Sequence, residues 1–143
     1  MAVEAFGAIQ SFNTKNGGDL HDKQYYIVKL DTTANTVVIA GQYEGDGILQ
    51  NEPKYDATNG FYEAASVLTA SGVKAKVVAG DAIANIGTAY PLEADSSGRA
   101  VAFTRTVPGT TATKLIGYPI EAASAAGQII TIVTCFAPDK FGA

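Results

Sequence analysis

Short runs of apolar residues, separated by glycines and polar turns, recur along the whole chain. The clearest alternation has Val73, Ala75 and Val77 interleaved with Lys74 and Lys76, which is typical of an antiparallel strand with one buried face. The same criteria predict further strands at 24–30, 36–40, 47–50, 99–104 and 128–136, and a short extended segment at 115–120. Residues 61–70 could begin with a helical turn at Glu63-Ala-Ala-Ser, but a strand is favoured there. The pattern therefore predicts a mainly β fold.

Between these strands the sequence indicates turns and very little helix. Polar residues at 51–60 and 93–98 predict a loop and a turn, and 121–127 predicts one helical turn that ends at Gly127. The tetrapeptide Glu-Ala-Ala-Ser occurs at both 63–66 and 121–124. Because this tetrapeptide is common, it indicates an internal repeat only if the structure contains related hairpins.

Residues 1–18 differ from the rest because they lack a sustained period. We predict an extended N-terminal arm that ends at Asn16-Gly17-Gly18 and is loose on its own. Residues 19–143 are then a single β-rich domain. The arm carries four apolar side chains that could contact a partner: Val3, Phe6, Ile9 and Phe12.

Composition limits the partners that we expect. Of the 143 residues, 47% are hydrophobic and only 17% are charged, with a net charge of −4, which favours an oligomer or a docked subunit. No basic stripe is present, so we expect no nucleic-acid partner. No apolar run approaches the roughly 20 residues that span a bilayer, and residues 1–6 do not resemble a signal peptide.

Candidate catalytic and metal-binding residues are few. The single histidine, His21, lies in a turn, and the single cysteine, Cys135, lies in an apolar run where we expect a buried thiol. One His and one Cys cannot form a metal cluster, so we predict no cofactor and no enzyme activity. Weak calcium binding at 42–47 stays open, although the acid pairs Asp19/Asp22, Glu44/Asp46 and Glu93/Asp95 lie in turns, where solvated acids are common.

Several segments in a fixed order resemble the small capsid cement, or head decoration, proteins of tailed bacteriophages. They are Tyr26–Asp31, Asn35–Ala40, Gly47–Asn51, Val73–Ile83, Ala94–Val101, Ile116–Ser124 and Gly127–Val133. The resemblance implies a small antiparallel β-barrel, β-tulip-like or sandwich domain with at most one or two short helices.

The resemblance also implies a location and partners. It places the chain on the outer capsid surface of the virion, as a homotrimer that binds the major capsid protein and stabilises the head. The arm, through Val3, Phe6, Ile9 and Phe12, would be the part that contacts the capsid.

Two other functions remain as alternatives. A phage tail or receptor-binding module would share the same β architecture but would bind molecules of the host surface. A glycosidase-like enzyme that uses the acidic turns is the third hypothesis, and no acid pair in the sequence has a supporting site.

Overall fold

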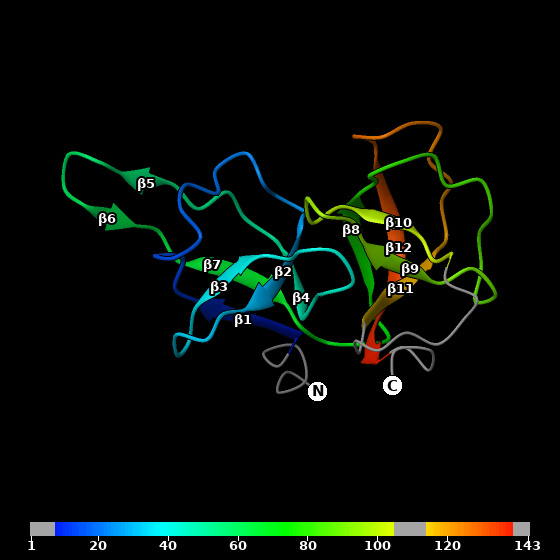
Figure 1. The fold of residues 1–143 in the computed structure, drawn as a ribbon, viewed down its shortest axis with the longest axis horizontal. Coiled ribbons are helices and arrows are strands. Elements are labelled where there is room, and N and C mark those ends of the chain that lie inside the picture. The colour runs from blue at the N-terminus through cyan, green and yellow to red at the C-terminus, as the bar shows by residue number, and fades with distance from the viewer. Residues whose placement is uncertain (1–7, 105–113, 139–143) are drawn as a thin grey trace.

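The computed structural model describes residues 8–104 and 114–138, which form twelve short strands. Five strands of the N-terminal half and the five strands of the C-terminal half build one sheet each, and the two sheets lie side by side (Figure 1). A separate two-stranded hairpin projects from the N-terminal half (Figure 1). Every pairing between the strands is antiparallel.

The first sheet has the order β1-β7-β4-β2-β3. Its strands are β1 (Ile9–Phe12), β2 (Ile27–Leu30), β3 (Val37–Ile39), β4 (Gly47–Leu49) and β7 (Ala65–Leu68). The projecting hairpin is formed by β5 (Tyr55–Asp56) and β6 (Phe61–Tyr62), which lie between β4 and β7 in the sequence. We call residues 8–70 the N-terminal half.

The second sheet has the order β10-β9-β11-β12-β8. Its strands are β8 (Lys74–Val78), β9 (Leu92–Ala94), β10 (Ala100–Ala102), β11 (Lys114–Pro119) and β12 (Ile129–Pro138). We call residues 71–138 the C-terminal half. The short connection between the halves is held by Thr134, whose buried hydroxyl donates a hydrogen bond to the carbonyl of Ala70 at 2.7 Å.

The two sheets have the same topology. When the strands of each sheet are numbered in sequence order, both sheets have the spatial order 1-5-4-2-3. In both sheets the end of strand 1 meets the start of strand 3 at one isolated parallel bridge, Asn13–Thr36 in the first and Ala79–Ala100 in the second. Each sheet therefore curls until its edge strands touch at one point, and neither closes into a barrel.

Matching residues support this internal repeat. The turn between strands 2 and 3 begins with Leu30-Asp31-Thr32-Thr33 in one half and Ala94-Asp95-Ser96-Ser97 in the other. The fifth strands contain Ser66-Val67-Leu68-Thr69 and Thr131-Ile132-Val133-Thr134. In contrast, the two Glu-Ala-Ala-Ser segments are not equivalent, because 63–66 enters β7 whereas 121–124 lies in the loop before β12.

Two clusters of buried side chains form the core. The smaller cluster fills the inside of the first sheet and contains Leu20, Val28, Val37, Leu49, Ala65 and Val67. The larger cluster joins the second sheet to the first: its members from the first half are Ile27, Ala40, Ile48 and Leu68. One face of the first sheet is therefore buried against the C-terminal half, and the two halves pack as one body.

The prediction of a mainly β fold is confirmed, and a strand overlaps each of the eight predicted ranges. Three predictions about local structure are wrong. Residues 121–127 form bends and a turn without helix, the loop 51–60 contains β5, and the turn at 93–98 begins only at Asp95 because Glu93 belongs to β9. Within residues 8–104 and 114–138, all the secondary-structure elements are strands, and no segment is long enough to form a helix element.

We expected the whole arm to be loose, but part of its second half is an ordered strand. Ile9–Phe12 form β1, which pairs with β7 in the register Ile9–Leu68 to Phe12–Ala65. The partner strand lies more than fifty residues away in the sequence, so the local sequence lacks the signal for this pairing. The arm therefore contributes an edge strand to the first sheet.

Candidate functional surfaces

The arm residues are the first candidates for a binding surface. Val3 and Phe6 lie outside the described residues, whereas Ile9 and Phe12 are both in β1. The side chain of Ile9 is 49% exposed. Phe12 is partly buried and packs against the core inside the first sheet. The structure therefore presents Ile9 to a partner and uses Phe12 for its own fold.

The backbone of β1 has one edge directed away from β7. Thr69 donates a hydrogen bond from its N–H to the carbonyl of Ala8 at 3.0 Å, so the backbone groups of Ala8 face β7. Because directions alternate along a strand, the N–H and C=O groups of Ile9 and Ser11 face the opposite edge. Asn13 continues this pattern, since its N–H donates to the carbonyl of Asn35 at 2.8 Å. Among the described residues, no strand pairs with this edge before Asn13.

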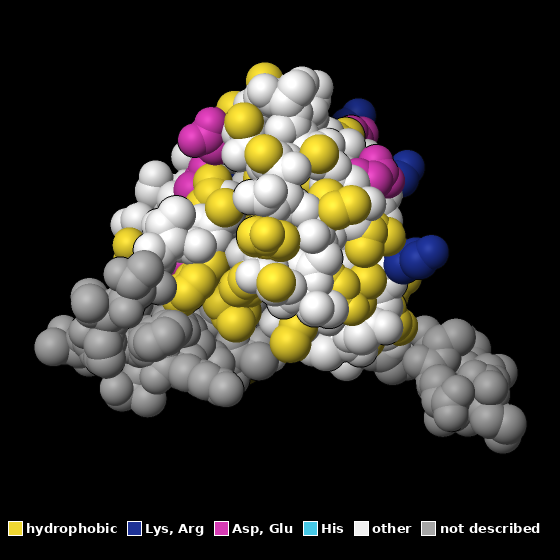
Figure 2. Space-filling view, turned by 90° about the vertical axis from the view of Figure 1, so that its right-hand side faces the viewer, with side chains coloured by type: hydrophobic (Ala, Val, Ile, Leu, Met, Phe, Trp, Pro, Cys, Tyr) yellow, Lys and Arg dark blue, Asp and Glu magenta, His cyan; other side chains and the backbone are white. Residues whose placement is uncertain are grey.

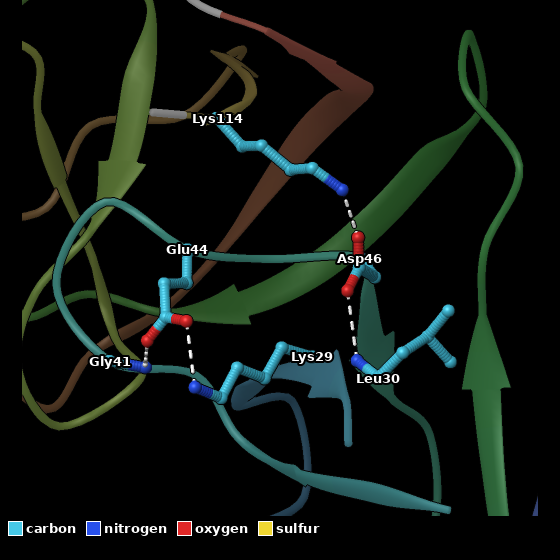
Figure 3. A network of polar contacts seen from close by, with 6 residues as sticks. All are labelled: Lys29, Leu30, Gly41, Glu44, Asp46 and Lys114. Atoms are coloured by element: carbon cyan, nitrogen blue, oxygen red, sulfur yellow. Dashed lines mark hydrogen bonds and ion pairs between the residues drawn. The ribbon is translucent and has the colours of Figure 1, made fainter. Parts of the chain in front are cut away.

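The acid pair Glu44 and Asp46 belongs to a polar network between the halves (Figure 3). Glu44 accepts hydrogen bonds from Lys29 Nζ at 2.7 Å and from the N–H of Gly41 at 3.1 Å. Asp46 accepts one from the N–H of Leu30 at 2.8 Å and pairs with Lys114 on β11 of the other half. All four carboxylate oxygens have partners, so this turn has a structural role and a cation would have to displace two lysines.

His21 and Asp19 form an exposed pair in the loop after β1. The His21 Nδ1 atom is 3.2 Å from Asp19 Oδ2, and the two side chains are 54% and 44% exposed. Partial desolvation acts to raise the pKa of Asp19, but hydrogen bonds from the backbone N–H groups of His21 and Tyr55 lower it below its ordinary value. The Asp19 carboxylate thus anchors the base of the β5-β6 hairpin, which is a structural role.

The remaining candidates do not converge on a common site. Glu93 is buried in β9, and Asp95 lies in the following turn, where it accepts hydrogen bonds from the N–H groups of Ser97 and Arg99. Cys135 is exposed, so the expectation of a buried thiol is wrong. From Ile130 to Phe136 of β12 the even-numbered side chains face the core, and Cys135 points to the other side. No group of three or more His, Cys, Asp or Glu side chains suited to a metal ion occurs within residues 8–104 and 114–138.

Exposed apolar side chains gather on the C-terminal half. Ile86, Tyr90 and Ile129 are 52%, 46% and 52% exposed. Figure 2 shows hydrophobic side chains down the middle of this end of the molecule, with charged side chains only towards the sides. The sequence holds the signal for this surface, because segments 82–92 and 122–138 contain no charged residue. The predictions from the sequence do not include this surface.

A group of exposed aromatic side chains lies at the opposite end of the molecule, on the β5-β6 hairpin. The rings of Tyr55 and Tyr62 stack across the β5-β6 hairpin, with their centroids 4.2 Å apart. Phe61 beside them is 59% exposed. This hairpin projects from the rest of the fold (Figure 1), so its aromatic side chains are accessible to a partner.

Three comparisons with known proteins found no relative of this chain. No protein family model matches the sequence, no curated protein is significantly similar, and no solved structure matches the fold. Within the described residues, no helix has the length and hydropathy needed to cross a membrane.

Proposed function

We propose that this protein is a non-enzymatic structural protein of a virion, which decorates the outer surface of an assembled phage head and stabilises it. Its partners would be the major capsid protein and further copies of itself, as a homotrimer. The proposal rests on the resemblance of segments 24–133 to head decoration proteins. The observation that carries it is the open edge of β1, at the point where the arm joins the sheet.

An open strand edge offers a specific way to bind another protein. The outward N–H and C=O groups of Ile9 and Ser11 can pair with an extended segment of the capsid protein, which would add a strand beside β1. The exposed side chain of Ile9 would add apolar contact area to this pairing. A protein that binds only the assembled shell then stabilises that shell by mass action.

The test uses heads of the phage that encodes this chain, assembled without the chain. The purified protein should sediment with these heads in many copies per particle. Ser11→Pro removes one outward donor and keeps the bonds to β7, because proline is tolerated on edge strands. We expect it to weaken head binding about threefold to tenfold, which is the contribution of one hydrogen bond.

Ser11→Ala is the matched control, because it removes the same hydroxyl and keeps the backbone donor. It should bind heads like the unmodified protein. If wild-type protein fails to sediment with the heads, the proposed function is wrong. If Ser11→Pro and Ser11→Ala bind equally well, the contact lies elsewhere than the edge of β1.

The projecting hairpin favours one second function, that of a tail or receptor-binding module. Exposed Phe61 and the stacked tyrosines are the side chains that commonly anchor binding surfaces. Labelled protein that binds host cells, and loses that binding on Phe61→Ala, would support this function. Binding to host cells without any binding to heads would replace the first proposal by the second.

A further inference from the structure

The internal repeat makes it possible to compare equivalent surfaces of the two halves. In the N-terminal half, Gly47 pairs with Val28 of strand 2, and the next residue, Ile48, pairs with Leu68 of strand 5. In the C-terminal half, Gly117 pairs with Leu92 of strand 2, and the next residue, Tyr118, pairs with Val133 of strand 5. The pair Tyr118–Val133 therefore occupies the position of the pair Ile48–Leu68.

The N-terminal pair lies on a covered face. Ile48 and Leu68 are 0% and 7% exposed, and Ile27 beside them is 0% exposed. These three side chains belong to the cluster that contains Ile116 and Ile132 of the C-terminal half. The face of the first sheet that carries them is thus buried by another unit of the same topology.

The equivalent face of the C-terminal half has no such cover among the described residues. Tyr118 and Val133 are partly exposed, and Cys135 and Ile129 on the same side of β12 are exposed. On β8 the neighbouring outward residues are Lys74 and Lys76, both exposed. We call the outward side of β8, β12 and β11 the outer face of the second sheet.

The charges of the two halves are complementary. Residues 8–70 contain eight acidic residues and four lysines, whereas residues 71–138 contain four acidic and five basic residues. The outer face of the second sheet carries Lys74 and Lys76 beside its apolar strip. An acidic partner is therefore favoured there, and the N-terminal half of another chain is acidic.

We propose that the outer face of the second sheet binds the N-terminal half of a second copy of this chain, head to tail. The contact would cover the apolar face that the packing of the two halves leaves open, and it would place the lysines of that face against the acidic half of the neighbouring chain. Such a heterologous contact produces a ring if it closes and a filament if it does not. This inference rests on the repeat. It names the surface through which the copies of the proposed homotrimer would associate, and it holds whether or not the protein binds a head.

Sedimentation velocity of the full chain over a range of concentrations tests the proposal. The wild-type protein should form oligomers, and higher salt should weaken them because part of the attraction is electrostatic. Val133→Glu places a carboxylate in the contact, opposite an acidic half, and should weaken self-association at least about tenfold. Ser96→Glu is the matched control, because it adds the same charge at an exposed residue of the turn between β9 and β10, which belongs neither to the outer face nor to the N-terminal half.

Cys135 gives a second measurement that needs no variant. It is the only cysteine of the chain and lies on the proposed contact face. Its alkylation by a maleimide should slow as the protein concentration rises through the association range. The circular dichroism spectrum of each variant reports whether it folds, so that loss of oligomers is not confused with loss of structure.

Three results would overturn the proposal. The first is a wild-type protein that stays monomeric up to about 100 µM, a concentration at which even weak specific contacts form. The second is an oligomer that Ser96→Glu disrupts and Val133→Glu does not. The third is an alkylation rate of Cys135 that is the same in monomer and oligomer. None of these results depends on head binding, which Ser11→Pro tests separately.

Discussion

The two halves of this protein share one strand order and differ in what covers them. In the N-terminal half, both faces of the sheet are buried, one by Leu20 and the loop after β1 and the other by the C-terminal half. In the C-terminal half, only the inner face is buried, and the outer face carries Tyr118 and Val133 in partly exposed positions. Equivalent faces of two sheets with the same topology are thus part of the core in one half and part of the surface in the other.

The difference shows how a repeated unit gains a binding surface without a dedicated motif. Joining two identical units buries one apolar face between them and leaves the equivalent face of the last unit uncovered. A chain with only 17% charged residues has few charged side chains with which to cover that face. The asymmetry of a two-unit chain is therefore a physical reason for expecting an apolar contact surface at one end.

Truncation of equivalent side chains gives the largest expected difference between the halves. Leu68→Ala should cost about 2–5 kcal/mol of unfolding free energy, because it removes a buried side chain between the halves and leaves a cavity. Val133→Ala, at the equivalent position, should cost about 1 kcal/mol, because the side chain is partly exposed and has less contact to lose. Urea unfolding of the dilute protein measures both values. Equal costs would mean that the two faces are equally covered.

The equivalent glycines of the fourth strands should both be costly to replace. A Cβ at Gly47 would lie 2.4 Å from Val67 Cγ1 and 2.8 Å from the carbonyl oxygen of Leu68. A Cβ at Gly117 would lie 2.1 Å from the carbonyl oxygen of Val133. Gly47→Ala and Gly117→Ala should each cost about 1–3 kcal/mol, because the fifth strand must move in both sheets. Gly117→Ala should cost the more of the two, because the φ of 154° at Gly117 is itself unfavourable for alanine. Thermal unfolding compares the two variants, and Gly72→Ala is not a suitable control because its φ of 80° is itself unfavourable for alanine.

Gly41→Ala serves better as the control for these glycines. Its added Cβ would meet the end of the Glu44 side chain, which can rotate away. A small effect of Gly41→Ala beside large effects at Gly47 and Gly117 would localise the cost to the fourth and fifth strands. If Gly117→Ala is tolerated while Gly47→Ala is not, the two sheets are less alike at this position than their registers indicate.

How far the sequence predicts this fold depends on the range of the contacts. Strands such as β8 and β12 were predictable because alternation and β-branched residues are local signals. β1 was not predictable, because its four residues are a strand only through pairing with β7. β5 and β9 were missed because they are two or three residues long and lie among polar residues.

The repeat was also hidden from the sequence for a physical reason. The equivalent segments Val67-Leu68-Thr69 and Ile132-Val133-Thr134 conserve size and polarity rather than identity. The connection between the fourth and fifth strands contains a hairpin in the first half and only a short loop in the second, which breaks any constant spacing. The only repeated tetrapeptide, Glu-Ala-Ala-Ser, occurs at positions that are not equivalent and points to the wrong alignment.

The ion pair between Asp46 and Lys114 is expected to give the smallest effect, and it tests whether the halves are joined by charge as well as by the core. The two side chains are 25% and 43% exposed, so solvent screens the pair and its coupling energy should be about 0.2–1 kcal/mol. A double-mutant cycle with Asp46→Ala and Lys114→Ala isolates this energy from the hydrogen bond that Asp46 accepts from the N–H of Leu30. The pair of Glu44 with Lys29 lies within the N-terminal half and provides the comparison. If the coupling between the halves vanishes in high salt while Leu68→Ala remains costly, the shared apolar core is what holds the two units together.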